Sequence, residues 1–212
     1  APFNANMPSA SAPSRTGYIF KGYFDGRNGT GTQYYSASMG SLHKWDKSSI
    51  GTLYAYWEAR TYTVSFNYNN GNGNNGSIIA TYDSEMPSIS GVPTRTGYIF
   101  VGYYDSANNG TKYYNADLTS AKTWDKTSNT TLYAHWIGVD YSVRFDGNGS
   151  TSGRMDNQAF VYATAQNLNV NRFARTGYTF VGWNTEADGN GTSYDNSASV
   201  NNLTTENNGI VV

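Results

Sequence analysis

Apolar and aromatic residues alternate with polar ones in short segments along the chain. In residues 98–103 the aromatic side chains of Tyr98 and Phe100 are two positions apart, and residues 132–136 place Leu, Ala and Trp on one face. Residues 62–66 alternate in the same way. This period of two predicts β-strands with one buried face. No segment keeps a helical apolar period over three turns, so only short helices are predicted, around 115–122 and 196–203.

Asn-Gly pairs separate the predicted strands. Both residue types tolerate positive φ, so these pairs predict tight hairpin turns. They occur at Asn28-Gly29, Asn75-Gly76, Asn109-Gly110, Asn148-Gly149 and Asn190-Gly191. Short strands joined by tight turns indicate a mainly β protein.

The same motifs recur along the chain about 80 residues apart. Arg-Thr-Gly-Tyr-x-Phe-x-Gly-aromatic occurs three times, while Leu-Tyr-Ala-x-Trp and Tyr-x-Val-x-Phe each occur twice in the same order. We expect the motif residues to be structural and to define the repeat. They are Arg15, Gly17, Tyr18, Phe20, Gly22, Arg95, Gly97, Tyr98, Phe100, Gly102, Arg175, Gly177, Tyr178, Phe180 and Gly182, together with Trp57 and Trp136.

This motif order divides the chain into three modules. Residues 61–139 form a complete repeat, whereas residues 1–60 lack the opening strand and residues 140–212 lack the closing strand. We expect the chain to be cut from a longer array. Alternatively, neighbouring subunits supply the missing strands, as in a filament built by strand exchange. The connectors at residues 58–60 and 137–140 are too short for free swivelling, so the array is predicted to be an elongated, semi-rigid rod.

Composition narrows the function classes. The chain has 14 Lys and Arg against 15 Asp and Glu, so it lacks the basic footprint needed for nucleic acid or anionic lipid. It contains no Cys, which excludes disulfides and thiolate metal sites. Aromatic residues make up 16% of the chain, and their burial is expected to hold such small modules together. No cofactor is expected, and the polar, weakly charged composition is typical of secreted β-proteins.

Catalysis and metal binding have few candidate groups. Carboxylates recur at Asp25, Asp46, Asp105 and Asp125, but hydrolysis needs two groups in one pocket and copies in separate modules lie apart. We expect the two that follow a tryptophan, Asp46 and Asp125, to cap turns or to pair with Lys47 and Lys126. The two histidines, His43 and His135, occupy non-equivalent positions. The loops starting at Asp146 and Asp188 have oxygen ligands at alternating positions, as Ca²⁺ prefers, but hairpin turns explain them equally. An enzyme is therefore not expected.

Repeated aromatics offer one candidate binding site. Flat apolar rings with amide neighbours can stack on sugars. The candidate ligand-contact residues are Tyr34, Tyr35, Trp45, Tyr113, Tyr114 and Trp124. The alternative is that these rings fill the core or cover strand edges. The recurring arginines are predicted to pair with a carboxylate or with strand-end carbonyls.

The order of these motifs resembles the Listeria–Bacteroides repeat, the B-repeat type of module of internalin-like surface proteins. The segments 143–149 and 176–183 are especially similar to it, whereas Tyr23 and Tyr103 stand where Trp is commoner. The resemblance implies small β-grasp-like modules, in tandem, in secreted or surface proteins. We therefore expect a non-enzymatic stalk or adhesin segment whose partners are neighbouring repeats. The alternatives are a glycan- or protein-binding module and a filament subunit.

Overall fold

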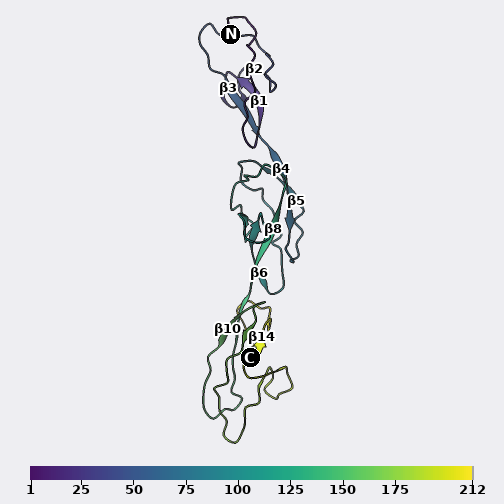
Figure 1. The fold of residues 1–212 in the computed structure, drawn as a ribbon, viewed down its shortest axis with the longest axis vertical. Coiled ribbons are helices and arrows are strands. Elements are labelled where there is room, and N and C mark those ends of the chain that lie inside the picture. Colours follow the sequence, from purple (N-terminus) through teal and green to yellow (C-terminus); the bar gives the residue numbers. More distant parts are fainter. Residues whose placement is uncertain (212) are drawn as a thin grey trace. The chain divides into compact units, whose positions relative to one another are not determined.

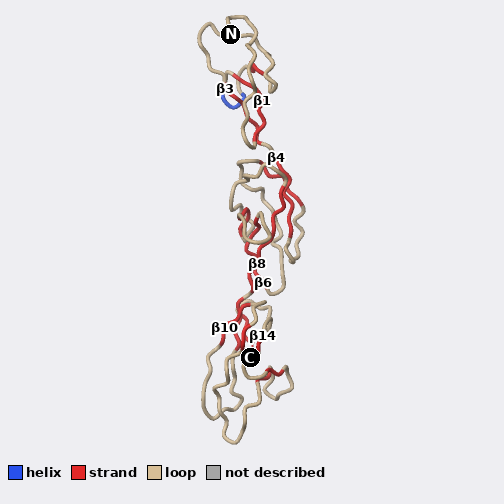
Figure 2. The backbone as a smooth tube through the Cα atoms, viewed as in Figure 1, coloured by secondary structure: helices blue, strands red, loops and turns tan. Residues whose placement is uncertain are grey.

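The computed structural model describes residues 1–211 and is mainly β (Figures 1 and 2). The first repeat forms a three-stranded sheet of order β2-β1-β3. Its strands are β1 (Tyr18–Phe24), β2 (Gln33–Tyr35) and β3 (Tyr54–Ala59). A short 3-10 turn, η1 (Arg27–Gly29), connects β1 to β2. Both neighbours of β1 pair with it antiparallel, so the repeated Gly-Tyr-x-Phe motif forms the central strand.

The second repeat forms a five-stranded sheet of order β5-β4-β8-β6-β7. Its strands are β4 (Thr61–Asn67), β5 (Ser77–Thr81), β6 (Tyr98–Tyr104), β7 (Lys112–Asn115) and β8 (Thr130–Gly138). The first and last strands, β4 and β8, pair in parallel at the centre, whereas β4 pairs antiparallel with β5. This mixed topology is consistent with a β-grasp-like module.

The third repeat has shorter strands around a core of its own. They are β9 (Asp140–Val143), β10 (Gln158–Val161), β11 (Gln166–Asn167), β12 (Trp183–Asn184), β13 (Ser193–Tyr194), β14 (Ser199–Val200) and β15 (Gly209–Val211). Strand β9 pairs antiparallel with β10 and parallel with β15, as β4 does with β5 and β8. The buried core consists of Tyr141, Val143, Phe145, Phe160, Leu168 and Val200.

The chain divides into two compact units. One comprises residues 1–67, 75–90 and 102–133, and the other comprises residues 68–74, 91–101 and 134–212. Strands β6 and β8 each contribute residues to both units. The predicted boundaries of the three modules, 1–60, 61–139 and 140–212, stay a prediction. The division into two units groups residues that lie close in space and does not follow the sequence period.

Most predicted strands are confirmed. Strand β8 buries Leu132 and Ala134 completely, as the alternating pattern predicts, and leaves Tyr133 between them only partly buried. Both predicted short helices are wrong, because residues 115–122 contain a strand end, a turn and a bridge, and residues 196–203 contain a turn and strand β14. Among the described residues the only helical segment is the 3-10 turn η1.

The Asn-Gly prediction holds at three of the five pairs. The backbone has positive φ at both residues of Asn28-Gly29, Asn109-Gly110 and Asn148-Gly149. The pairs at residues 75–76 and 190–191 do not have this conformation; near the second, the left-handed glycine is Gly189, with φ of 82°. A dipeptide sets a turn preference, and the lengths of the flanking segments decide where the turn falls.

One predicted strand is wrong in the third repeat. The motif that forms β1 and β6 contributes only Trp183–Asn184 to a strand there. The physical reason is that a strand forms only where another strand pairs with it. Strand β1 pairs with β3 and β6 lies beside β8, whereas the described part of the third repeat has no strand next to residues 178–181.

Candidate functional site: the junctions between repeats

A single linker residue connects one repeat to the next, and the surrounding backbone bonds to it on both sides. The amide of Arg60 donates to the carbonyl oxygen of Gly17 at 2.8 Å, and its carbonyl accepts from the amide of Tyr82 at 2.9 Å. The second junction repeats this pattern at Val139, which donates to Gly97 at 3.0 Å and accepts from the amide of residue 162 at 2.9 Å. Each junction lies within one compact unit. The linker residue is therefore part of the ordered backbone network rather than a free hinge.

An aromatic ring of the following repeat lies over the glycine of the preceding one. Gly17 and Gly97 are buried, with φ of +77° and +76°. A Cβ on Gly17 would lie 2.3 Å from Cδ1 of Tyr82, and a Cβ on Gly97 would lie 2.4 Å from Cε1 of Tyr162. Glycine is required here for two reasons, since the backbone is left-handed and the ring occupies the Cβ position.

The tyrosine after each glycine is enclosed between an arginine and the ring of the next repeat. Tyr18 and Tyr82 meet edge to face with ring centroids 5.7 Å apart, and Tyr98 and Tyr162 do so at 5.3 Å. Both pairs have an interplanar angle of 76°. The guanidinium carbon of Arg15 lies 3.7 Å from the centroid of the Tyr18 ring. Edge-to-face and cation–π contacts each contribute about 1 kcal/mol.

The recurring arginines therefore have a role that the sequence did not indicate. Arg95 and Arg175 also lie over the next tyrosine, at 3.8 and 4.1 Å from the ring centroids. Arg175 Nη1 also donates to the carbonyl of Asn148 at 3.2 Å, but Asn148 lies in the loop between β9 and β10 and not at the predicted strand end. No ion pair involves these three arginines in the part of the chain that the structure describes.

Sequence reasoning missed the second half of the junction, Tyr82 and Tyr162. These residues are themselves 80 positions apart, and a left-handed residue follows each, with φ of 63° at Asp83 and 62° at Ala163. Their 80-residue spacing, which equals the spacing of the repeated motif, was the signal in the sequence that could have identified them. At the first junction the Tyr18 hydroxyl also donates to Asp83 Oδ2 at 3.0 Å, and this hydrogen bond raises the pKa of Tyr18. The second junction has alanine in that place.

The structure buries five of the six predicted ligand-contact aromatics. Tyr34, Tyr35, Tyr113, Tyr114 and Trp124 are all core residues. The hydroxyls of Tyr35 and Tyr114 donate to the carbonyls of Pro8 and Pro87 at 2.7 and 2.6 Å. Those of Tyr34 and Tyr113 donate to the carboxylates of Asp46 and Asp125. These rings therefore offer no exposed face to a sugar, which corrects the binding-site interpretation in favour of its structural alternative. The buried hydroxyls explain why tyrosine rather than phenylalanine recurs there.

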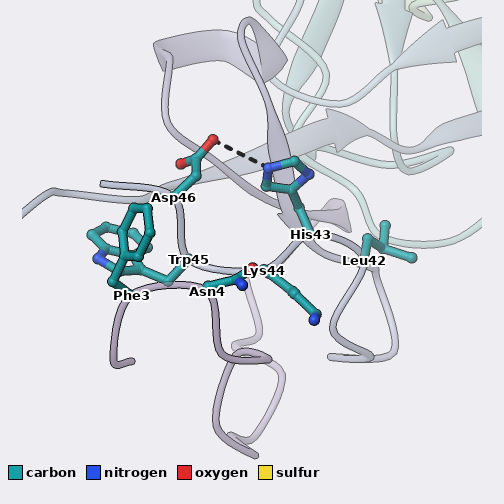
Figure 3. Close-up of a pocket in the computed structure, with 7 residues that line it drawn as sticks. All are labelled: Phe3, Asn4, Leu42, His43, Lys44, Trp45 and Asp46. Carbon is teal, nitrogen blue, oxygen red and sulfur yellow. Dashed lines mark hydrogen bonds and ion pairs between the residues drawn. The ribbon is translucent and has the colours of Figure 1, made fainter. Parts of the chain in front are cut away.

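Trp45, the sixth candidate, is partly buried beside a surface pocket of about 340 Å³. Figure 3 shows Phe3 next to the Trp45 ring and Leu42 on the opposite side of the pocket. His43 Nε2 and Asp46 Oδ2, 3.2 Å apart, form the ion-pair contact drawn there. Phe3 and Leu42 are 69% and 60% exposed, so the pocket is open to solvent on its apolar sides.

The two repeated lysines pair most closely with Asp25 and Asp105, not with the aspartates beside tryptophan for which the salt bridge was predicted. Lys47 Nζ lies 3.8 Å from Asp46 Oδ1, and Asp125 pairs with Lys122 at 2.9 Å. Lys47 Nζ lies 2.8 Å from Asp25 Oδ2, and Lys126 Nζ lies 2.6 Å from Asp105 Oδ2. Each aspartate also accepts a backbone amide at 2.7 Å, from Thr32 and Thr111. The lysine and then the amide hold the pKa of Asp25 below its ordinary value; at Asp105 burial opposes the same two bonds without cancelling them. Each of these two carboxylates thus bonds a lysine and a backbone amide of its own repeat.

The two loops considered for Ca²⁺ use their aspartates to cap turns. Asp146 Oδ1 accepts the amide of Asn148 at 2.8 Å, and Asp188 Oδ1 accepts the amide of Asn190 at 3.0 Å. Within residues 1–211 no three His, Cys, Asp or Glu side chains lie together. The two aspartates have the turn role that the hairpin alternative gives them.

Comparison with known proteins agrees with the repeat geometry. The family model of the Listeria–Bacteroides repeat domain matches residues 3–55, 62–135 and 141–206. A protein of Evansella cellulosilytica whose name describes a membrane protein is 30% identical over 92% of this chain and 27% of its own length. Internalin H of Listeria monocytogenes is 32% identical over 65% of this chain and 22% of its own length. The chain thus spans about a quarter of these relatives. No solved structure matches, and the described residues include no helix long and apolar enough to cross a bilayer.

Proposed function

Since the chain belongs to the Listeria–Bacteroides repeat family, we propose that it is a non-enzymatic spacer segment of a bacterial surface protein. In this proposal neighbouring repeats are each other's main partners, and the junctions keep successive modules in a fixed relation. The duplicated junction supports the proposal most strongly. Arg60 and Val139, at equivalent places in the repeat, have the same two backbone hydrogen bonds and the same aromatic contact above a glycine.

Semi-rigid spacing follows from the energetics of one junction. Backbone hydrogen bonds contribute about 0.5–1.5 kcal/mol each, and an edge-to-face aromatic pair contributes a similar amount. If the net gain over the open state is about 2 kcal/mol, the closed junction is favoured about 30-fold. A linker of one bonded residue also has few alternative conformations. An array with such junctions would behave as a rod, and small-angle scattering from a compact particle would count against that.

Surface display is supported by the relatives. One is named as a membrane protein and another is an internalin, and this chain corresponds to only part of each. Because the junctions restrict movement between repeats, they favour the role of a stalk that projects another part of the protein.

The test measures how firmly one junction is closed. Ala37 and Ala116 are exposed, lie at equivalent places in the first two repeats and belong to one compact unit. Because the chain has no Cys, Ala37→Cys with Ala116→Cys gives a unique pair for spin labels. We expect a narrow distance distribution by pulsed electron paramagnetic resonance.

The matched variant adds Tyr82→Ala, which removes the ring above Gly17. We expect the distribution to broaden in this variant while the strand content by circular dichroism stays the same. A broad distribution in the chain that retains Tyr82, unchanged by Tyr82→Ala, would refute the spacer proposal.

A further inference from the structure

One side-chain hydrogen bond spans the first junction and has no counterpart at the second. The Tyr18 hydroxyl donates to Asp83 Oδ2 at 3.0 Å, which connects β1 to the residue that follows Tyr82 in the next repeat. At the second junction Ala163 stands in the place of Asp83. Among residues 1–211 the Tyr98 hydroxyl has no hydrogen-bond partner.

The rings and the backbone around this bond are alike at the two junctions. Both tyrosine pairs have an interplanar angle of 76°, and Arg15 and Arg95 lie over their tyrosines at 3.7 and 3.8 Å. The backbone is left-handed at Asp83 and at Ala163, with φ of 63° and 62°. A carboxylate at position 163 would therefore begin from a backbone of the same conformation, beside a tyrosine hydroxyl that is free to donate.

The linker residues differ in the same sense. Arg60 is exposed, and its Nε donates to the carbonyl oxygen of Tyr18 at 3.3 Å. Val139 has no side-chain donor and is only 4% exposed. The first junction thus adds polar side-chain bonds to the contacts that both junctions share, whereas the second adds the burial of an apolar side chain.

We propose that Asp83 is a positioning residue whose hydrogen bond with Tyr18, here termed the latch, holds the Tyr18 ring against Tyr82. The residue after the junction tyrosine, Asp83 or Ala163, then decides whether a junction is latched. A carboxylate is a stronger acceptor than a neutral group, but this bond lies at the surface, so its effect on the closed state is a few-fold. One exposed position thereby sets the firmness of a junction without altering the core of either repeat.

This inference rests on the proposed spacer function, because it requires junctions that close. Native-state hydrogen exchange of the full chain measures the latch at the amides of Arg60 and Tyr82, which donate the backbone bonds of the first junction. In Tyr18→Phe, which keeps the ring and removes only the hydroxyl, both amides should exchange about 2- to 10-fold faster. In the matched variant Tyr98→Phe, the corresponding amides of the second junction should keep their rates.

A gain-of-function variant shows whether the carboxylate itself is the latch. Ala163 is exposed, so Ala163→Asp should fold. We expect it to slow the exchange of the Val139 and Tyr162 amides about 2- to 10-fold. Because aspartate also tolerates a left-handed backbone better than alanine does, the substitution is repeated together with Tyr98→Phe, where the slowing should largely disappear.

The outcomes separate the latch from the spacer function. Protected amides at the first junction whose rates do not change in Tyr18→Phe would overturn the latch and leave the spacer function standing. Equal slowing by Ala163→Asp with and without the Tyr98 hydroxyl would also overturn the latch, since the backbone alone would explain it. Exchange of the Arg60 and Tyr82 amides in the unaltered chain at the rate of an unstructured peptide would overturn both.

Discussion

Gly97 and Gly177 hold the same place in the repeated motif and have nearly identical backbones, with φ of +76° and +77°. Alanine in this left-handed region costs roughly 1–2 kcal/mol of backbone strain at either position. The surroundings differ, because a Cβ at Gly97 would lie 2.4 Å from Cε1 of Tyr162 and one at Gly177 would meet nothing within 4 Å. Gly97→Ala and Gly177→Ala therefore separate the strain of the backbone from the loss of the junction.

The difference between the two variants follows from what the Tyr162 ring must give up. In Gly97→Ala the ring has to move, which forfeits its contact with Tyr98, about 0.5–1.5 kcal/mol. The movement also weakens the two hydrogen bonds at Val139, each of which contributes about 0.5–1.5 kcal/mol. We expect Gly97→Ala to cost about 1–3 kcal/mol more local stability than Gly177→Ala.

Native-state hydrogen exchange measures this cost at the junction itself. The amides of Val139 and Tyr162 are the two donors that bridge the repeats. In Gly97→Ala they should exchange about 5- to 150-fold faster than in the unaltered chain, and in Gly177→Ala their rates should not change. If both variants left these rates unchanged, or raised them equally, the ring of Tyr162 would not be holding the junction closed.

Two further perturbations test the packing and the charges. Phe100→Ala should lower the free energy of unfolding of its repeat by about 3–5 kcal/mol, as expected for a buried phenylalanine. Phe180→Ala should cost less than half of that, because Phe180 is more exposed. Equal losses of stability in denaturant titrations would contradict this difference in exposure. Asp105→Asn should lower the melting temperature at neutral pH by an amount equivalent to less than about 1 kcal/mol, because the ion pair with Lys126 is near the surface. The pKa of Asp105 is depressed in the folded state, so its contribution is present above the ordinary value of 3.8 and is lost as the pH falls further. The difference in melting temperature between the two proteins should therefore shrink on acidification below that value, and a constant difference would contradict the assignment.

Most of the candidate binding residues illustrate a limit of composition arguments. Tyr34 and Tyr113 were candidates because a flat ring with amide neighbours can stack on a sugar, and the alternative was that such rings fill the core. The structure buries both rings completely and gives each hydroxyl a carboxylate partner, so the polar end of the ring is satisfied inside the module. Sequence alone cannot distinguish a tyrosine whose ring is exposed from one whose ring is buried and whose hydroxyl reaches a carboxylate at the surface of the module.

The amino-acid sequence by itself determined the repeat, the mainly β class and the place of most strands. These features follow from local chemistry: alternation selects extended backbone with one buried face, and Asn-Gly favours left-handed turns. The pattern also indicated that Lys47 and Lys126 form salt bridges within their repeats, but it assigned them to Asp46 and Asp125, whereas the shortest contacts are with Asp25 and Asp105.

Only the tertiary structure decided what one motif becomes in each of its three places. The segment that begins at Gly17 or Gly97 is a strand, with its glycine beneath the tyrosine of the next repeat, whereas the segment that begins at Gly177 is open and mostly unpaired. The local sequence is nearly the same in all three. A β-strand requires hydrogen-bonding partners from a distant part of the chain, so its formation depends on which neighbours are present as well as on its own residues.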